Sequence, residues 1–396
     1  MKKKVFISFT GAMEIGGIER SLISLLNNFD YDKYEVDLFL YAHRGPLFGE
    51  INKNVNILPE VKNLAYVKDS FKTKIKKHAW YSALLRLNDY LTKTMPENSR
   101  EKIVIKRVDN IDKEYDLAIG FFQPFDVMHH KIKAKRKIGW IHTDYDVYLD
   151  AMEESKRDWY VEYLRKNYSR VDKIFGVSED CSNVFINIFP EFKDKVGVIE
   201  NMLDSTYVNN VANSINVESE MPNDGFTRLL TVGRYEFAKN MENIPIICSE
   251  LLKKGLNVKW YIVGFGGMEE EIKKSIITHG MQNNVIMLGK RDSAYPYIKA
   301  CDWYIQPSRY EGKAVVVLEA QMLCKPVIIT DYPTSGSQLR DGYDGVIVPL
   351  ENKACADIIS EVLIDDSLKA VLEKNCKESD YSNSKEMNKI YAEACR

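Results

Sequence analysis

Short apolar segments alternate with stretches of helical spacing in two separate series along this chain of 396 residues, and this alternation restricts its possible folds. Strands that alternate with helices are typical of βα units, which assemble into parallel sheets. The expected strands of the first series are 4–9, 35–41, 116–120, 137–141 and 173–177. Those of the second series are 228–233, 259–264, 285–289, 303–305, 326–330 and 345–348. The sequence therefore predicts an α/β protein with two Rossmann-like domains.

The two series are separated by polar chain from about residue 207 to 225, rich in Asn, Ser, Glu and Gly, which is typical of a linker. We expect an amino-terminal domain over 1–206, a carboxyl-terminal domain over 226–375 and a helical tail over 376–396. Ligands of open parallel sheets bind outside the carboxyl ends of the strands, where glycine lets the backbone approach them. Because the first three strands of the second series end at a glycine, we expect a ligand there.

Composition and charge exclude several classes of protein. Hydrophobic residues make up 45% and charged residues 28%, as in ordinary globular proteins, and no apolar run approaches the roughly 20 residues of a membrane-spanning helix. The formal net charge of −2 argues against a nucleic-acid partner. Seven cysteines without a C-x-x-C pair favour reduced thiols, and the apolar run after Lys4 is too short for a signal peptide. We therefore expect a cytoplasmic, enzyme-like protein.

The stretch 68–107 differs from the rest, with eleven Lys and Arg residues against four acidic residues. Large apolar side chains are interleaved with these charges: Phe71, Ile75, Trp80, Tyr81, Leu84, Leu85 and Leu87. A basic amphipathic segment rich in aromatic residues can lie on an anionic membrane surface. The alternative is a solvated helical insertion whose apolar face packs on the core, and the sequence does not decide between them.

Two glutamates, Glu311 and Glu319, stand in a segment that follows the expected strand 303–305. Gly312 supplies a tight turn, and the apolar run after it predicts a buried helix whose free N–H groups and dipole favour a pyrophosphate. A carboxylate inside that helix suits two hydrogen bonds to a ribose diol, as in dinucleotide sites. Taken alone, two glutamates at this spacing are commonplace. A dehydrogenase is disfavoured, because Glu269 stands where a dinucleotide fingerprint beginning at Gly264 needs its third glycine.

Several further motifs accompany this segment. They are Gly16-Gly17-Ile-Glu-Arg20, Val177-Ser178, Val198-Ile-Glu-Asn201, Leu203-Asp204, Val232-Gly-Arg234 with Lys239, Val263-Gly-Phe-Gly266, Leu288-Gly289, Glu311 with Glu319-Ala320, Lys325-Pro-Val327, Thr330-Asp331 and Gly342-Tyr-Asp-Gly-Val-Ile-Val-Pro349. Each is weak alone, but jointly they are specific and cover most of the chain. With them the chain resembles the retaining glycosyltransferases of family 4. The resemblance implies the GT-B architecture, in which two Rossmann-like domains face each other across a cleft and a carboxyl-terminal helix returns to the first domain.

The resemblance also implies roles for individual residues. Arg234 and Lys239 would hold the donor diphosphate and neutralise the departing nucleotide, although they could also form a surface pair beside Glu236 and Glu242. At the next position the family often has glycine, whereas this chain has Asn240. The implied catalytic residues are Glu311, His142, Arg234 and Lys239. The implied donor-binding residues are Gly16, Gly17, Gly233, Arg234, Lys239, Gly264, Lys290, Ala314, Val315, Val316 and Glu319.

The pair Asp144 and Asp146 could be mistaken for a metal site, since D-x-D binds a divalent cation in the other main glycosyltransferase architecture. Because Arg234 and Lys239 would already supply positive charge, we expect these aspartates to be structural or to face the acceptor. His142 follows the expected strand 137–141, and we expect it to position the donor sugar. Neither a metal nor a cofactor is expected.

The expected function is the retaining transfer of a hexosyl group from a nucleotide-diphosphate sugar to a glycan or lipid-linked acceptor, in capsule, exopolysaccharide or similar surface-polysaccharide synthesis. A UDP-sugar is favoured, with GDP-mannose as the second candidate. The expected location is cytoplasmic, with peripheral attachment to the inner face of the membrane through 68–107 as the open question. Two alternatives remain. One is a nucleotide-sugar epimerase of the same fold, although no second base accompanies His142. The other is a non-catalytic nucleotide-sugar-binding protein.

Overall fold

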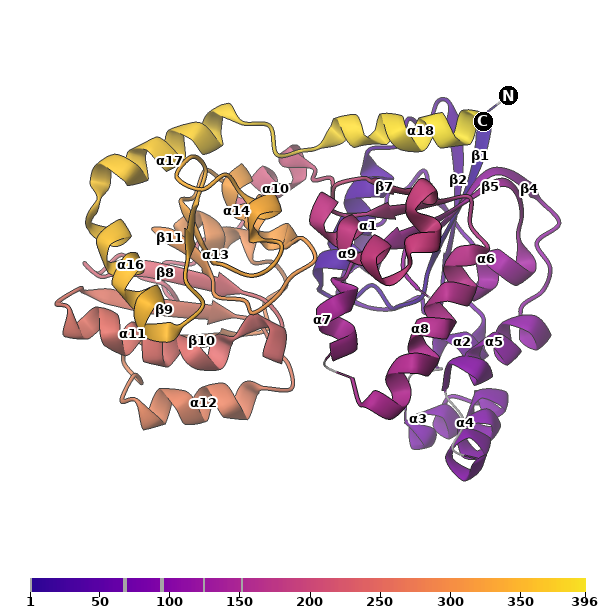
Figure 1. Cartoon of the computed structure of the whole chain (residues 1–396), viewed down its shortest axis with the longest axis horizontal. Coiled ribbons are helices and arrows are strands. Elements are labelled where there is room, and N and C mark those ends of the chain that lie inside the picture. The colour runs from indigo at the N-terminus through magenta and orange to yellow at the C-terminus, as the bar shows by residue number, and fades with distance from the viewer. Residues whose placement is uncertain (1, 67–69, 93–95, 124, 151) are drawn as a thin grey trace. The chain divides into compact units, whose positions relative to one another are not determined.

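The computed structural model divides the chain into two compact units. The first consists of Met1–Glu200 with Lys385–Arg396, and the second consists of Asn201–Ser384 (Figure 1). The residues that the structure describes are 2–66, 70–92, 96–123, 125–150 and 152–396. No helix among these described residues has the length and apolar character needed to cross a membrane.

The first unit is built on a seven-stranded parallel sheet in the order β3-β2-β1-β4-β5-β6-β7. The strands are β1 (Lys3–Phe9), β2 (Tyr34–Leu40), β3 (Asn56–Ile57), β4 (Glu114–Gly120), β5 (Lys133–Ile141), β6 (Lys173–Gly176) and β7 (Val196–Val198). Along the chain the sheet grows in one direction from β1 to β3 and in the other from β4 to β7. The order therefore reverses between β1 and β4.

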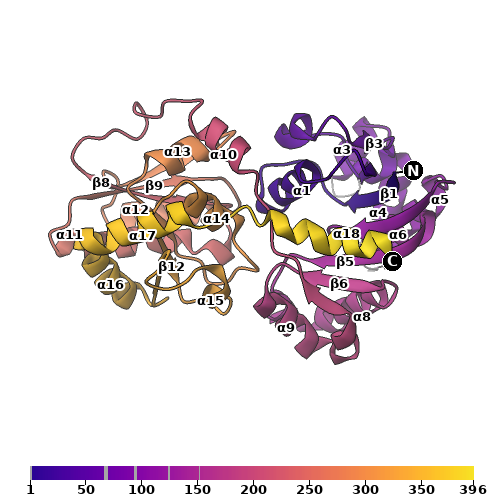
Figure 2. The same cartoon turned by 90° about the horizontal axis from the view of Figure 1, so that it is seen from above.

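Helices connect these strands and cover the sheet (Figures 1 and 2). They are α1 (Gly17–Asn27), α2 (Lys62–Ala65), α3 (Phe71–Lys76), α4 (Trp80–Thr92), α5 (Pro96–Arg107), α6 (Asp126–Lys131), α7 (Tyr145–Asp150), α8 (Glu154–Ser169), α9 (Glu179–Ile188) and, from the end of the chain, α18 (Met387–Cys395). Figure 2 shows α18 in yellow along β5 of this unit. Tyr391 stacks on Tyr34 with ring centroids 4.4 Å apart, and Arg136 binds Glu393 at 2.7 Å. The expected return of the carboxyl-terminal helix to the first unit is confirmed.

The second unit has a six-stranded parallel sheet in the order β10-β9-β8-β11-β12-β13. The strands are β8 (Thr227–Val232), β9 (Val258–Val263), β10 (Val285–Gly289), β11 (Trp303–Gln306), β12 (Val327–Thr330) and β13 (Val346–Val348). The helices are α10 (Ser205–Ala212), α11 (Ile244–Lys253), α12 (Glu269–Thr278), α13 (Tyr295–Ala300), α14 (Val315–Met322), α15 (Ser335–Gln338), α16 (Asn352–Ile364) and α17 (Asp366–Glu378). Here the strand order reverses between β8 and β11. The two sheets confirm the predicted α/β fold with two Rossmann-like domains.

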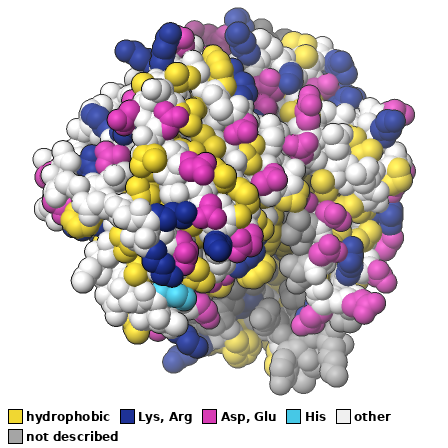
Figure 3. All heavy atoms as spheres, turned by 60° about the vertical axis from the view of Figure 1, so that its left-hand side comes forward, with side chains coloured by type: hydrophobic (Ala, Val, Ile, Leu, Met, Phe, Trp, Pro, Cys, Tyr) yellow, Lys and Arg dark blue, Asp and Glu magenta, His cyan; other side chains and the backbone are white. Residues whose placement is uncertain are grey.

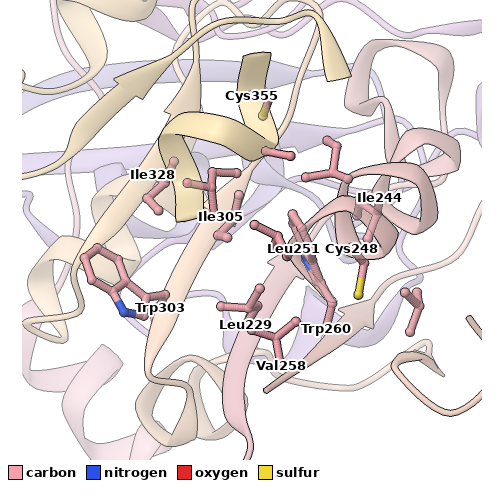
Figure 4. Close-up of a cluster of buried hydrophobic side chains, with 14 of the residues drawn as sticks. Leu229, Ile244, Cys248, Leu251, Val258, Trp260, Trp303, Ile305, Ile328 and Cys355 are labelled. Carbon is pink, nitrogen blue, oxygen red and sulfur yellow. The ribbon is translucent and has the colours of Figure 1, made fainter. Parts of the chain in front are cut away.

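Apolar side chains of β8, β9, β11 and β12 form the core of the second unit with α11 and α16 (Figure 4). Trp260 and Trp303 are its largest members, and both are almost fully buried. The indole N–H of Trp260 donates to the hydroxyl of Thr231 at 2.9 Å, so this polar atom is satisfied inside the core. The face in Figure 3 carries acidic and basic side chains interspersed, in keeping with the formal net charge of −2.

The segment 207–225, which the sequence predicts to be a linker, contributes to the core of the second unit instead. Its first part forms α10, and Val208 and Ala212 are buried on one face of this helix at positions i and i+4. Val217 and Met221 after the helix are buried as well. The helical spacing extends over only eight residues, and the chain after it is rich in Asn, Ser and Glu, so the segment has the composition of a linker. The edge strands β3 and β7 were not predicted either, because strands of two and three residues are too short to show an alternation of apolar and polar side chains.

Candidate active site

The strongest site candidates of the second unit gather where the strand order reverses, at the carboxyl ends of β8 and β11. In open parallel sheets this point is where ligands bind. The loop after β8 lies against the loop after β9: the N–H of Gly233 donates to Val263 at 3.0 Å, and that of Tyr235 donates to Phe265 at 2.9 Å. A Cβ atom on Gly264 would lie 1.8 Å from the carbonyl oxygen of Gly233, so only glycine allows this approach.

Lys239 is carried by a short 3₁₀ turn, Phe237–Lys239, which ends at Asn240. Asn240 adopts a left-handed conformation with φ of 56°, and its side-chain oxygen accepts from the amide of Asn243. Asparagine tolerates this conformation better than other side chains, because its short polar group bonds locally. The residue that departs from the family pattern therefore takes the backbone conformation that a glycine would supply.

Lys239 and Glu311, which lie on different loops, form an ion pair with Nζ 2.5 Å from Oε1. Their side chains are 18% and 10% exposed, so solvent screens the pair much less than it would at the surface. Arg309 ties the two loops together: its backbone N–H donates to Ala238 at 2.7 Å and its guanidinium donates to the carbonyl of Phe237 at 2.6 Å. The ion pair is thus set in a fixed loop framework.

Glu311 accepts two further hydrogen bonds from the end of β11. Ser308 Oγ donates to Oε1 at 2.7 Å and Gln306 Nε2 donates to the same oxygen at 3.3 Å. Thr334 holds the backbone of Glu311 by donating to its carbonyl at 2.8 Å. Neither Gln306 nor Ser308 was expected at the site from the sequence. A signal was available, because both are polar residues at the end of a buried strand, within five residues of Glu311.

Arg234 lies in the same loop as Lys239, but its side chain is 59% exposed. Its guanidinium lies 3.1 Å from the Glu236 carboxylate, an exposed pair of the kind that contributes about 0 to 1 kcal/mol to stability. Glu242, the other neighbour considered from the sequence, binds Arg309 at 2.6 Å instead. Arg234 therefore keeps its charge at the surface, where an anionic ligand can reach it.

The buried helix predicted after Gly312 is α14, which begins at Val315. The N–H of Ala314 donates to Gln338 Oε1 at 2.6 Å, whereas the N–H groups of Val315 and Val316 have no acceptor among the residues described. The start of this eight-residue helix therefore offers two free donors and the positive end of its dipole.

Glu319 lies on the second turn of α14 and is buried, with 3% of its surface exposed. The hydroxyl of Tyr295 donates to Glu319 Oε1 at 2.8 Å and orients the carboxylate. Lys290 follows β10, and its ammonium group lies 4.7 Å from the centre of the Phe265 ring. Gly233, Arg234, Lys239, Gly264, Glu311 and the start of α14 thus all belong to loops at the carboxyl edge of one sheet.

In the first unit the reversal point lies between β1 and β4, and Gly16 and Gly17 follow β1 there. Gly16 is the residue before α1 and has no side chain with which to cap the helix. A Cβ atom on Gly16 would lie 2.4 Å from a carboxylate oxygen of Glu19. The loop after β1 therefore brings bare backbone to the carboxyl edge of the sheet.

His142 directly follows β5, as the sequence predicts. Its ring packs on Phe121 at 4.6 Å and on Trp140 at 5.9 Å between centroids. Burial lowers the pKa of His142 to about 3, so the imidazole is neutral at physiological pH. Its Nε2 atom has no hydrogen-bond partner among the described residues.

Asp144 supports the start of α7. Its carboxylate accepts from the N–H of Asp146 at 3.0 Å, and its carbonyl accepts from Tyr148 at 3.2 Å. Asp144 is buried, whereas Asp146 is exposed. Within the part of the chain that the structure describes, His, Cys, Asp and Glu form no group of three or more that could hold a metal ion.

Comparison with known proteins shows which family this part of the chain is similar to. Residues 215–379 match the family described as Glycosyl transferases group 1. A UDP-Gal:alpha-D-GlcNAc-diphosphoundecaprenol alpha-1,3-galactosyltransferase of Escherichia coli is 23% identical over 74% of this chain and 80% of its own. The crystal structure of Anabaena Alr3699/HepE in complex with UDP and glucose superposes with a TM-score of 0.70, at 17% identity over 99% of both chains. The chain has the fold of the GT-B glycosyltransferases.

Several other relatives match over a smaller share of their length. An alpha-D-kanosaminyltransferase of Streptomyces kanamyceticus is 26% identical over 37% of this chain and 39% of its own length. The chain spans about two fifths to one half of the length of several such relatives. The family match covers the unit that holds Lys239, Glu311 and α14, which is also where the sequence motifs are densest.

Proposed function

We propose that this protein is a retaining glycosyltransferase of family 4, which moves a hexosyl group from a nucleotide-diphosphate sugar to a glycan or lipid-linked acceptor. The observation that carries the proposal is the Lys239–Glu311 pair beside the free N–H groups at the start of α14. This arrangement provides fixed positive charge for a diphosphate and a carboxylate for sugar hydroxyls. A UDP-sugar is favoured over GDP-mannose, because the E. coli relative is named for UDP-Gal and the Anabaena structure holds UDP and glucose.

In the proposed mechanism the diphosphate is held by the N–H groups of Val315 and Val316 and by the side chains of Arg234 and Lys239. The acceptor oxygen attacks the anomeric carbon from the face that the phosphate leaves. The C1–O bond to phosphate breaks, and the acceptor proton passes to a phosphate oxygen. The two cations stabilise the negative charge that develops on the departing nucleotide, so we propose that the reaction needs no divalent metal.

The carboxylates have separate proposed roles. Glu311 orients hydroxyl groups of the donor sugar, and Glu319, itself oriented by Tyr295, binds the ribose diol. His142 is neutral, so it acts as a hydrogen-bonding partner of the sugar and not as an acid. The pathway we propose is surface-polysaccharide synthesis of the capsule or exopolysaccharide kind, at the inner face of the cell membrane.

The test is to incubate the purified protein with a panel of UDP- and GDP-sugars and to measure release of the nucleotide diphosphate, with and without acceptors. Lys239→Ala, which should lower kcat by about a hundredfold, is the matched control variant. Release that depends on an acceptor and on Lys239 supports the proposal. Conversion of the donor sugar to an epimer without nucleotide release would support the epimerase instead, and binding without any conversion would support a non-catalytic protein.

The membrane partner is proposed from the helices α3 and α4. Trp80, Leu84 and Leu87 lie at positions i, i+4 and i+7, which form one face of α4, and they are 51%, 64% and 44% exposed. Phe71 on α3 is 47% exposed. The smaller apolar residues Ala79 and Ala83 are buried. These large apolar side chains therefore do not pack into the core, and their exposure favours attachment to a bilayer over a solvated insertion.

Exposed basic residues accompany this apolar face. Lys72, Lys76 and Lys77 are exposed and have no carboxylate partner among the described residues, whereas Lys74 is buried with 2% exposure. Lys68 and Lys93 of the predicted basic stretch lie outside the described residues. We call the set Phe71, Lys72, Lys76, Lys77, Trp80, Leu84 and Leu87 the α3–α4 face.

A further inference from the structure

The Glu311 carboxylate is bonded very unequally at its two oxygens. Lys239 Nζ, Ser308 Oγ and Gln306 Nε2 all donate to Oε1, at 2.5, 2.7 and 3.3 Å. Oε2 receives no hydrogen bond from any residue that the structure describes. One oxygen of this carboxylate is therefore saturated by the protein, and the other keeps its full capacity to accept.

Gln306 and Ser308 are locked in the orientation that produces this pattern. The buried hydroxyl of Tyr304 donates to Gln306 Oε1 at 2.6 Å, so the amide group must turn its NH₂ toward Ser308 and Glu311. Gln306 Nε2 then donates to Ser308 Oγ at 2.8 Å, which leaves the single proton of Ser308 for Glu311. Burial raises the pKa of Tyr304 well above its usual value and keeps this hydroxyl a donor.

These residues have no access to solvent that could replace a lost partner. Tyr304, Gln306 and Ser308 are each 0% exposed. The backbone is held as well, because Thr330 Oγ1 donates to the carbonyl of Ser308 at 2.6 Å. Removing one side chain from such a chain of hydrogen bonds leaves its neighbours unsatisfied, and the carboxylate at the end can then rotate.

We propose that Gln306 and Ser308 are positioning residues: they saturate Oε1 of Glu311 so that Oε2 is presented, in one orientation, to a hydroxyl group of the donor sugar. This inference rests on the proposed function, because the donor sugar is the group that hydrogen-bonds to Oε2. The new element is that one carboxylate oxygen of Glu311 faces the protein and the other faces the substrate. Gln306 and Ser308 touch no substrate in this scheme and act only through Glu311.

The experiment compares Ser308→Ala with Thr231→Val. Thr231 is equally buried and also loses hydrogen bonds, to Ile305 at 2.6 Å and from Trp260 at 2.9 Å, but it does not contact Glu311. Both variants should lose thermal stability and keep the calorimetric affinity for UDP. Only Ser308→Ala should lower kcat, by about tenfold, the order expected for one lost hydrogen bond in the transition state. Ser308→Cys, with a weaker donor of similar size, should fall between the two.

Equal kcat for Ser308→Ala and Thr231→Val would overturn the proposal, since the network would then only stabilise the fold. Failure of the proposed function has a different signature, namely a wild-type protein that turns over no nucleotide sugar. In that case a crystal structure of Ser308→Ala decides the geometric claim: we expect the Glu311 carboxylate to rotate, and an unchanged carboxylate would refute the positioning role.

Discussion

The α3–α4 face should bind anionic but not neutral vesicles, and replacing Lys72, Lys76 and Lys77 with Ser should remove most of this binding. Each basic residue near an anionic leaflet contributes about 1 kcal/mol. The three exposed lysines together contribute about 3 kcal/mol, so the partition coefficient should fall roughly a hundredfold. Lys74 is left in place because its side chain is buried.

Vesicle co-sedimentation at low and high salt measures this effect. The charge-dependent part should weaken as salt rises, because the Debye length shrinks from about 10 Å at 0.1 M to about 3 Å at 1 M. A remaining, salt-resistant part should come from apolar insertion. Leu84 is 64% exposed, and burying that surface contributes about 1 to 2 kcal/mol, so Leu84→Ser should reduce the salt-resistant part.

The matched control replaces three exposed lysines of the second unit, Lys274, Lys353 and Lys377, with Ser. It removes the same formal charge without touching the α3–α4 face and should leave vesicle binding unchanged. Equal binding to neutral and anionic vesicles, absence of binding, or an equal loss in the control would refute the reasoning and return α3 and α4 to the role of a solvated insertion.

Further predictions concern the second unit. Arg234→Ala and Lys239→Ala should each lower kcat by about a hundredfold, because each removes a charge that stabilises the departing nucleotide; near-normal turnover in steady-state assays would contradict the assignment for that residue. Glu319→Gln should chiefly raise the donor KM, since a ribose contact is equally strong in the ground state and the transition state, and Glu311→Gln should chiefly lower kcat. The same changes of KM and kcat in both variants would contradict these separate roles. Activity should persist in excess EDTA, and a loss that Mn²⁺ or Mg²⁺ restores would establish a metal-dependent reaction. Gly264→Ala should lower the melting temperature measured by calorimetry, because the new Cβ meets backbone 1.8 Å away, and an unchanged Tm would show that the two loops can separate at no cost.

The secondary structure of both units followed from local patterns. Strands β8 to β13 were all expected to within one residue at each end, because a buried strand of a parallel sheet is a short apolar run bounded by polar chain and glycine. The helix α14 was expected from the apolar run that follows the turn at Gly312. The local pattern failed at α10, where a helix of only eight residues is followed by polar chain and was taken for a linker.

The resemblance to family motifs indicated the charged residues of the site. The sequence by itself placed Arg234, Lys239 and Glu311 in loops after strands and Glu319 inside the helix that follows. It did not determine that Lys239 and Glu311 touch. That contact exists because β8 and β11 are neighbours in the sheet although two strands separate them in the chain.

Only the tertiary structure decided which oxygen of Glu311 is free and whether the apolar side chains of α4 are buried. Both depend on how the chain packs around a residue. Lys239, from a loop 72 residues away, joins Gln306 and Ser308 at one oxygen of Glu311, whereas Leu84 stays 64% exposed. The pattern of apolar and polar residues indicates which side chains must be buried or hydrogen-bonded, because apolar area and polar groups are properties of each residue. The order of strands and the meeting of loops decide which partner it finds.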